Sequence, residues 1–417
     1  MRGGDMLHGI GGLAVLLLVA WVLSEDRRHV SIRIVLSSVV LQIVLALLLI
    51  KFPLAASALL LLNKAVDALQ RATDAGTAFV FGYLGGAPPP FDEIHPEAGF
   101  ILAFRALPLV LVISALATLL FHWGVLQRIV GAFAWMLRRT VGVSGPLGLG
   151  AAVHIFVGMT EAPLLIRPYL ARMSRGELFA LMTCGMAGIA GTVMVIYAAL
   201  IGPIVPNALG NILISSVIST PAALAVAALM VPFLPSEEDS GRLVMEDPPV
   251  SAVDAIMKGT ANGVGMLVSI IAMLVVAIAL VTLVNMAIGH LPQWGGEPIS
   301  LQRIFAYGFR PVVWLMGVPW SESATAATLM GTKTVLNEFV AYVDLARLAP
   351  DSLDPKSRLI MTYALCGFAN FGSVGILIGG LGAIVPERRS EVVQLGLRSM
   401  ISGTLATCMS GTLVGML

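Results

Sequence analysis

Residues 186–193 read MAGIAGTV, and residues 366–373, which lie 180 positions further along the chain, read CGFANFGS. A second pair of segments has the same spacing: residues 201–206 read IGPIVP and residues 381–386 read LGAIVP. All four segments are apolar, and several glycines interrupt the longer two. Because glycine weakens a helix, the sequence predicts two copies of one unit, each with an apolar helix that is broken in the middle.

A carboxylate precedes each copy. Glu161 follows Thr160, and Glu338 follows Asn337 at an offset of 177 positions. An ionised carboxylate near the centre of a bilayer costs at least about 2.5 kcal/mol, so two at matching positions indicate a function. Repeated units with an ionisable residue and broken helices are the sequence signature of a secondary transporter. The structural alternative for Glu338 is an internal ion pair with Lys333.

The composition is that of an integral membrane protein. The chain has 417 residues, of which 58% are hydrophobic and 12% charged, and its mean hydropathy is +0.92. A soluble protein would carry about a quarter charged residues. The net charge of +1 and the absence of a basic cluster give no indication of a nucleic-acid partner. The three cysteines lie in apolar runs without CxxC spacing, so we expect no disulfide, no metal site and no cofactor.

Apolar runs long enough to span a bilayer, about 20 residues, occur at eight places: 7–23, 30–50, 100–122, 178–202, 208–234, 262–288, 357–381 and 392–416. Charged residues rather than a cleavage site follow the first run, which predicts a retained span. The distribution of Arg and Lys predicts an N-terminus outside the cytoplasm. Segments 54–85 and 126–140 carry polar or basic residues within apolar sequence and predict interfacial helices.

Segments 144–173 and 303–347 each contain two short apolar arms around a polar point. Arms too short to cross separately predict re-entrant hairpins. Three spans separate the hairpins, so the second copy is inverted and the two tips meet near the bilayer midplane. The predicted fold is therefore an all-α integral membrane protein with about eight transmembrane helices, two re-entrant helical hairpins, interfacial helices and an inverted repeat.

We expect four regions along the chain. Spans and interfacial helices that serve as scaffold and in oligomerisation occupy 1–140, and the first repeat, with its hairpin and two spans, occupies 141–234. An acidic linker and a central span occupy 235–302. The second repeat, again a hairpin and two spans, occupies 303–417.

The second broken span carries polar groups. Asn370 and Ser373 are three residues apart and therefore share a helix face, and the surrounding glycines can free backbone groups for a ligand. Close helix packing is the other explanation for glycine-rich spans, but it does not account for Asn370.

Several blocks of sequence resemble the signatures of the concentrative nucleoside transporter family. They are GMTEAPL at 158–164, IAGTV at 189–193, NEFVAY at 337–342 and CGFANF at 366–371. The resemblance implies a homotrimer of eight-span protomers in an inner or plasma membrane. It also implies a nucleoside site between the hairpin tips and the broken spans, with ribose contacts from Glu338, Asn370 and Ser373.

On the nucleobase side, the resemblance implies contacts from Thr160 and Glu161, with Val193 lining the pocket. Phe368 would stack on the base or only pack beside it. The family has glutamine where this chain has Met159, so a thioether replaces an amide. Recognition of the sugar therefore looks intact, whereas recognition of the base looks altered.

The ion site also departs from the family. Sodium-coupled members have asparagine and serine where this chain has His154 and Gly188, while the backbone carbonyls of Val157 and Ile189 remain. Because imidazole is a poor ligand for Na⁺ and histidine titrates near neutral pH, we expect H⁺ rather than Na⁺ as the coupling ion. The alternatives are sodium coupling, or a core histidine at 154 with no coupling role.

The predicted function is ion-coupled import of nucleosides by alternating access, by a multi-pass protein of the inner (plasma) membrane. Its partners would be the nucleoside, the lipid bilayer and two further copies of the chain. The alternatives are a carrier of another ribose-like solute, an intramembrane enzyme, or a channel or receptor. An enzyme is disfavoured because the sequence has no HExxH, GxSxG or P-loop motif.

Overall fold

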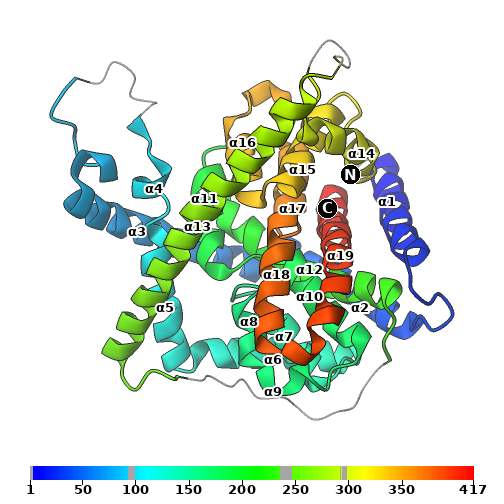
Figure 1. Ribbon diagram of the computed structural model, residues 1–417. Coiled ribbons are helices and arrows are strands. Elements are labelled where there is room, and N and C mark those ends of the chain that lie inside the picture. Colours follow the sequence, from blue (N-terminus) through cyan, green and yellow to red (C-terminus); the bar gives the residue numbers. More distant parts are fainter. Residues whose placement is uncertain (1–2, 93–98, 235–246, 292, 294–297) are drawn as a thin grey trace.

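The computed structural model describes residues 3–92, 99–234, 247–291, 293 and 298–417 (Figure 1). Within these ranges every regular element is helical, so the predicted all-α class is confirmed. In chain order the elements are α1 (Gly3–Val22), α2 (Ile32–Lys51), α3 (Pro53–Phe81), η1 (Gly82–Gly85), α4 (Leu102–Arg105), α5 (Leu109–His122), α6 (Val125–Val141), α7 (Gly145–Val153), α8 (Glu161–Leu165), α9 (Arg167–Leu170), α10 (Arg175–Ala187), α11 (Gly191–Ile201), α12 (Ala208–Met230), α13 (Ala252–Ile288), α14 (Leu301–Leu315), α15 (Ser323–Val335), α16 (Glu338–Arg347), η3 (Pro350–Ser352), α17 (Pro355–Leu365), α18 (Phe371–Ile384), η4 (Pro386–Arg388) and α19 (Arg389–Met416).

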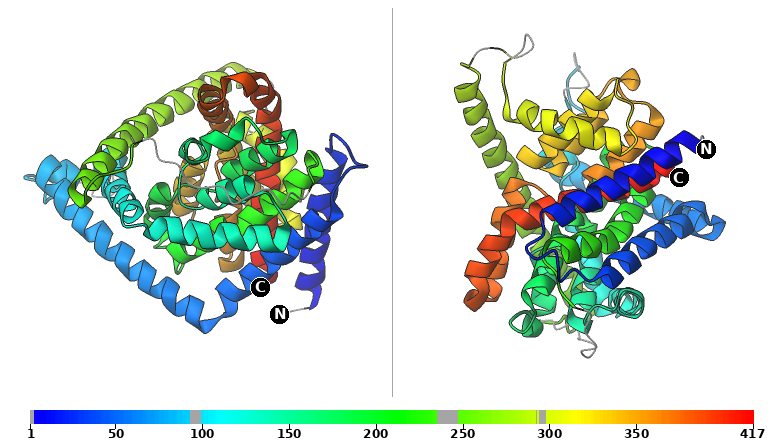
Figure 2. Two further views of the ribbon diagram at one scale, coloured as in Figure 1. Left: turned by 90° about the horizontal axis from the view of Figure 1, so that it is seen from below. Right: turned by 90° about the vertical axis from the view of Figure 1, so that its right-hand side faces the viewer.

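Helix α12 lies at the centre of the packing. Nearly all of its side chains are buried, and it contacts α2, α10 and α19. Small polar residues allow this close approach, as where Ser219 Oγ lies 2.8 Å from Ser410 Oγ of α19. Small residues and interhelical hydrogen bonds are what hold helices together in lipid. On its other side α19 runs beside α1, so the C-terminal end of α19 lies next to the N-terminal end of α1 (Figures 1 and 2).

Five helical stretches are long and apolar enough to cross a membrane: Ile32–Lys51, Leu102–His122, Arg175–Ile201, Ala208–Met230 and Ala252–Ile288. Met6–Val22 and Phe371–Ile384 are shorter apolar helices. Helix α19 covers the predicted span 392–416 but is rich in serine and threonine, most of which are buried among other helices. The number of eight spans therefore stays a prediction.

Each predicted hairpin contains a pair of helices with a short non-helical tip. In the first hairpin, α7 leads through residues 154–160 to α8 and α9, and in the second, α15 leads through residues 336–337 to α16. The sequence predicts a single hairpin over 303–347, but α14 is a separate helix that packs along α15. Gly317, with a φ of 104°, turns the chain between them, a conformation that glycine adopts without strain.

Helix α13 crosses the front of the molecule in Figure 1 and packs mainly against α5. Gly259 and Gly263 form the crossing point. A Cβ atom on Gly259 would lie 2.6 Å from Cα of Ala115, and one on Gly263 would lie 3.0 Å from Cα of Leu111. This is a GxxxG contact, in which the missing side chains let two helix backbones meet. Most side chains further along α13 are apolar and exposed.

Helices α3 and α6 cover the two segments predicted to be interfacial. Helix α6 buries one apolar stripe that includes Val130 and Leu137, while Arg139 on the same helix is exposed. Helix α3 runs along one edge of the molecule (Figure 2, left) and exposes Asp67 and Asp74. Both helices have the amphipathic character of interfacial helices.

Candidate functional site

The two broken helices meet at their breaks. Helix α10 ends at Ala187 and α11 begins at Gly191, while α17 ends at Leu365 and α18 begins at Phe371. The backbone N–H of Phe368 in one break donates to the carbonyl of Gly188 in the other, at 3.2 Å. A Cβ atom on Gly367 would lie 2.9 Å from the carbonyl oxygen of Met186, so a larger residue would push the two breaks apart.

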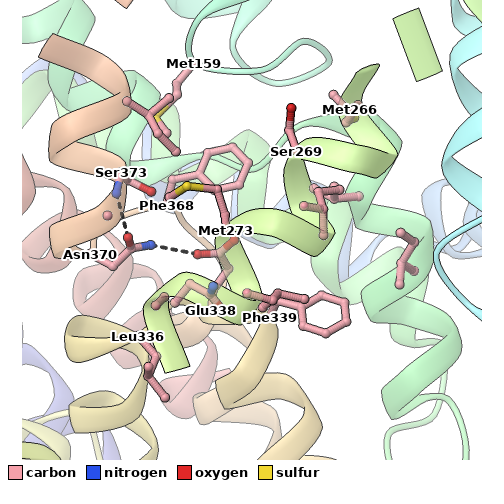
Figure 3. Close-up of a pocket in the computed structure, with 18 of the residues that line it drawn as sticks. Met159, Met266, Ser269, Met273, Leu336, Glu338, Phe339, Phe368, Asn370 and Ser373 are labelled. Atoms are coloured by element: carbon pink, nitrogen blue, oxygen red, sulfur yellow. Dashed lines mark hydrogen bonds between the residues drawn. The ribbon is translucent and has the colours of Figure 1, made fainter. Parts of the chain in front are cut away.

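A buried polar cluster lies beside this crossing. Glu338, the first residue of α16, accepts hydrogen bonds from the Asn370 amide at 3.1 Å and from the Tyr197 hydroxyl at 2.8 Å. The Asn370 side chain in turn caps α18, because its Oδ1 accepts the N–H of Ser373 at 2.7 Å. Figure 3 shows Asn370 between Ser373 and Glu338. The sequence-predicted sugar-binding residues thus come together from α16 and the break before α18.

The cluster faces a cavity of about 200 Å³ whose lining is mostly apolar. Of the predicted base-side residues, Met159, Val193 and Phe368 line it. Helix α13 forms the opposite wall, with Ser269 as a lone hydroxyl among apolar side chains (Figure 3). A mostly apolar pocket with a few fixed polar groups suits a small organic solute whose polar atoms lie at one end.

Thr160 and Glu161 are not among the described residues that line this cavity. The carboxylate of Glu161 accepts a hydrogen bond from the N–H of Gly158 at 2.9 Å, within its own hairpin tip. The Thr160 side chain packs on α18, where a Cβ atom on Gly380 would lie 3.0 Å from the Thr160 methyl group. The structure therefore brings only one of the two predicted carboxylates into the cavity.

Lys333 does not form an ion pair with Glu338. Its ammonium group donates to the carbonyl of Ala364 at 2.7 Å and to the Thr407 hydroxyl at 3.2 Å, while the Glu338 oxygens accept from Tyr197 and Asn370. The structure therefore does not contain the internal ion pair between Glu338 and Lys333 that was the alternative explanation for Glu338.

The residues predicted to couple the ion lie where the first hairpin meets α10. His154 caps the C-terminal end of α7 and is 4% exposed, and its Nε2 has no hydrogen-bond partner among the described residues. The ring packs on α10, since a Cβ atom on Gly185 would lie 3.1 Å from its Cε1. Val157 and Ile189 lie in the non-helical hairpin tip and in the break after α10.

Sequence reasoning missed Tyr197 and the wall formed by α13. Tyr197 lies four residues after Val193 and therefore shares its face of α11. This spacing alone could have predicted that Tyr197 lies beside the site. Ser269 is one of few polar residues in the apolar run 262–288. Neither Tyr197 nor Ser269 belongs to a recognisable binding motif, because each reaches the cavity only through the packing of segments that are distant in the sequence.

Comparison with known proteins gives three family models that together cover most of the chain. A model described as "Na+ dependent nucleoside transporter N-terminus" matches residues 11–84, and one described as "Nucleoside recognition" matches residues 103–204. A third, described as "Na+ dependent nucleoside transporter C-terminus", matches residues 211–415.

Among relatives, the putative nucleoside permease NupX of Escherichia coli is 34% identical, over 99% of this chain and 98% of that protein. The rat sodium/nucleoside cotransporter 1 is 33% identical, over 99% of this chain and 64% of that protein. Among solved structures, CNTnw in an inward-facing substrate-bound state matches with a TM-score of 0.88 and 34% identity, over 99% of this chain and 97% of that one.

Crossed broken helices, two helical hairpins and a polar cluster at their meeting point define a secondary transporter. The chain belongs to the concentrative nucleoside transporter family.

The prediction that the coupling ion is H⁺ rather than Na⁺ is wrong. The matching family is described as Na⁺ dependent, and the rat relative is named a sodium/nucleoside cotransporter. The structure supplies the physical reason. Charging the buried His154 ring would leave an unpaired cation in apolar surroundings, which is costly, and the Glu161 carboxylate accepts from Gly158.

Proposed function

We propose that this protein imports nucleosides by sodium-coupled alternating access. The observation that carries the proposal is the buried cluster of Glu338, Asn370 and Tyr197, which faces an apolar-walled cavity where the two broken helices cross. Carrier sites of this kind lie at the interface of repeats, next to interrupted helices.

Glu338, Asn370 and Ser373 would hold the ribose. A carboxylate that already accepts two hydrogen bonds still has lone pairs for a sugar hydroxyl. The Ser373 side chain is 5% exposed and lines the same cavity. Carboxylate, amide and hydroxyl side by side offer the donors and acceptors that neighbouring hydroxyl groups require.

The nucleobase would lie towards Met159, Val193 and Phe368, with Phe368 available for stacking. Thr160 and Glu161 contact the base in this proposal only if the first hairpin shifts towards the cavity during transport. The base is therefore recognised more weakly than the sugar in the conformation described above.

Sodium would bind beside Gly188, where two helix C-termini converge. A Cβ atom on Gly188 would lie 3.3 Å from the carbonyl oxygen of His154, at the end of α7, and 3.4 Å from that of Cys184, in the last turn of α10. Both helix ends carry partial negative charge, and Na⁺ is a hard cation that takes oxygen ligands. The carbonyls of Val157 and Ile189 are further candidates.

We further propose a homotrimer of multi-pass protomers in the inner (plasma) membrane. The exposed apolar length of α13 supports a surface that lies in lipid or against another copy of the chain, and the homotrimer is what the resemblance of the sequence motifs implies. Within the protomer, residues 1–140 and 235–302 would form the scaffold, and residues 141–234 and 303–417 would form the two repeats that carry the site.

The test is uptake of labelled uridine and adenosine into proteoliposomes under separately imposed Na⁺ and pH gradients. We expect an inward Na⁺ gradient to drive accumulation and replacement of Na⁺ by choline to abolish it. Equal uptake in choline would contradict sodium coupling, and the absence of any saturable nucleoside uptake would contradict the proposed substrate.

A further inference from the structure

Lys333 is a fully buried cation, and no carboxylate among the described residues forms an ion pair with it. It is 0% exposed and lies in the last turn of α15. Its ammonium group donates to the Ala364 carbonyl at 2.7 Å and to Thr407 Oγ1 at 3.2 Å. A buried charge is expensive unless its surroundings compensate it, so its position calls for an explanation that substrate binding does not provide.

The surroundings that compensate Lys333 are the end of a broken helix. The last four carbonyls of any helix lack partners within that helix, and α17 ends at Leu365, just before the break. Other elements supply donors to three of these four carbonyls. Thr362 accepts from the Tyr342 hydroxyl at 2.7 Å, Tyr363 from the Ser215 hydroxyl at 3.2 Å, and Ala364 from Lys333.

Lys333 is the only charged donor of these three. It lies where the C-terminal ends of α15 and α17 come together, and both ends carry partial negative charge. The Thr407 hydroxyl donates to the carbonyl of Thr404 at 3.0 Å, so its oxygen is free to accept from the ammonium group. The lysine thus joins α15, α17 and α19 at one point.

The first repeat has a similar arrangement, and none of the described residues places a Lys or Arg side chain in it. Cys184 precedes Ala364 by 180 positions. Its carbonyl oxygen and that of His154 border the space beside Gly188, 3.4 and 3.3 Å from where a Cβ atom would lie. There the ends of α7 and α10 lie close together, as the ends of α15 and α17 do in the second repeat.

We infer that Lys333 is a tethered cation that does in the second repeat what the coupling ion does in the first: it holds a hairpin to the end of a broken helix. Lys333 is therefore a positioning residue. It fixes the end of α17, and thereby the break that carries Asn370, so that Asn370 meets Glu338 on the second hairpin. This inference rests on the proposed sodium-coupled function, and it implies that the second repeat needs no ion of its own.

The test compares Lys333→Met, which keeps an unbranched chain of similar length but removes the charge, with Ser215→Ala as a matched control. Ser215→Ala removes the neutral donor to the neighbouring carbonyl. Amide hydrogen exchange of residues 362–371 is measured in the full-length protein, together with binding of uridine and 3′-deoxyuridine. Lys333→Arg tests rescue by a second cation.

We expect Lys333→Met to speed exchange across residues 362–371 and to weaken uridine binding about tenfold. The preference for uridine over 3′-deoxyuridine should fall towards one, whereas preference among bases should stay unchanged. A loss that was only structural would weaken both nucleosides equally. Lys333→Arg should recover part of the exchange protection, and Ser215→Ala should change both readouts by less than about threefold.

A folded Lys333→Met variant that behaves like Ser215→Ala would overturn the inference. If Lys333→Met does not fold, Thr407→Val decides, because it removes one acceptor and keeps the ammonium group. Faster exchange and a lower sugar preference would support the inference, and wild-type values of both would overturn it. If the unmodified protein binds no nucleoside, the proposed function fails, while hydrogen exchange still tests the role of Lys333.

Discussion

At the residue scale, the position of Glu338 depends on one donor from α11 and one from the break before α18. Tyr197 on α11 donates to one carboxylate oxygen at 2.8 Å, and Asn370 before α18 donates to the other at 3.1 Å. Neither donor alone would fix the carboxylate plane. The direction in which Glu338 presents its remaining lone pairs is therefore set by the contact between α11, α16 and the break before α18.

Tyr197→Phe should weaken nucleoside binding about three- to tenfold, because one neutral hydrogen bond is worth about 0.5–1.5 kcal/mol. The change removes only the hydroxyl group and keeps the ring, which packs against Tyr342 at 4.9 Å between ring centroids. Equilibrium binding of uridine measures the effect. Tyr363→Phe is the control, since its hydroxyl contacts Asn211 instead. Equal affinities of Tyr197→Phe and the unmodified protein would exclude a role for Tyr197 in the site.

Met159→Gln should shift the preference among nucleobases by about three- to tenfold, because it adds an amide to the apolar side of the cavity. Competition by a series of nucleosides against labelled uridine measures the shift, and discrimination against deoxyribose should stay the same. Met266→Leu, at another residue that lines the cavity, is the matched control and should leave the base preference unchanged. If the sugar preference changes instead of the base preference, the base does not lie near Met159.

The sequence predicts Glu338, Asn370 and Ser373 because polar groups stand out in apolar segments, and the structure brings these three together. The sequence does not predict that Lys333 donates hydrogen bonds to Ala364 and Thr407, because these two residues lie 31 and 74 positions further along the chain. Such contacts depend on how helices pack, and a single chain carries no local signal of them.

At the element scale, glycine positions predict the breaks but not the helix crossings. The breaks after Ala187 and Leu365 occur where glycines cluster, because the chain there lacks helix-forming side chains. The same residue type at Gly259 has a different purpose, since it lets α13 approach α5. The sequence does not predict α14 as a separate helix, because its pattern of polar and apolar residues is also the pattern expected for one arm of a hairpin.

Gly259→Ala should lower the thermal stability by several degrees, whereas Gly265→Ala should leave it unchanged or raise it. A Cβ atom at position 259 would lie 2.6 Å from backbone of α5, but nothing lies within 4 Å at position 265. Overpacking of this kind costs about 1–3 kcal/mol, while exposed glycine-to-alanine changes within a helix are favourable. Thermal unfolding of both variants in the same detergent is the measurement. Equal stability of the two variants would show that α5 and α13 can move apart without a loss of thermal stability.

At the scale of the whole molecule, one charged network joins the ends of several helices. Arg175 at the start of α10 binds both carboxylate oxygens of Glu25, at 3.1 and 3.0 Å, and lies 3.7 Å from Glu391 of α19. Arg398 of α19 lies 3.7 Å from Glu25, and the backbone N–H of Glu25 donates to Met230 of α12 at 2.8 Å. Glu25 therefore connects the loop after α1 to α10, α12 and α19.

Glu25→Gln should lower the melting temperature at pH 7 by about 1–2 °C, because exposed ion pairs contribute up to about 1 kcal/mol. The hydrogen bonds from Arg175 hold the pKa of Glu25 below its usual value near 4.5. A carboxyl group with a lowered pKa stabilises the folded state above that value, and the stabilisation is lost as the pH falls through the lowered pKa. The difference from the unmodified protein should therefore be constant above about pH 5, shrink below it, and be smaller in high salt. Asp26→Asn is the control, since the hydrogen bonds of Asp26 with the described residues stay within its own loop, to Arg28 and His29. A difference that persists unchanged to pH 3 would mean that Glu25 acts through packing rather than through its charge.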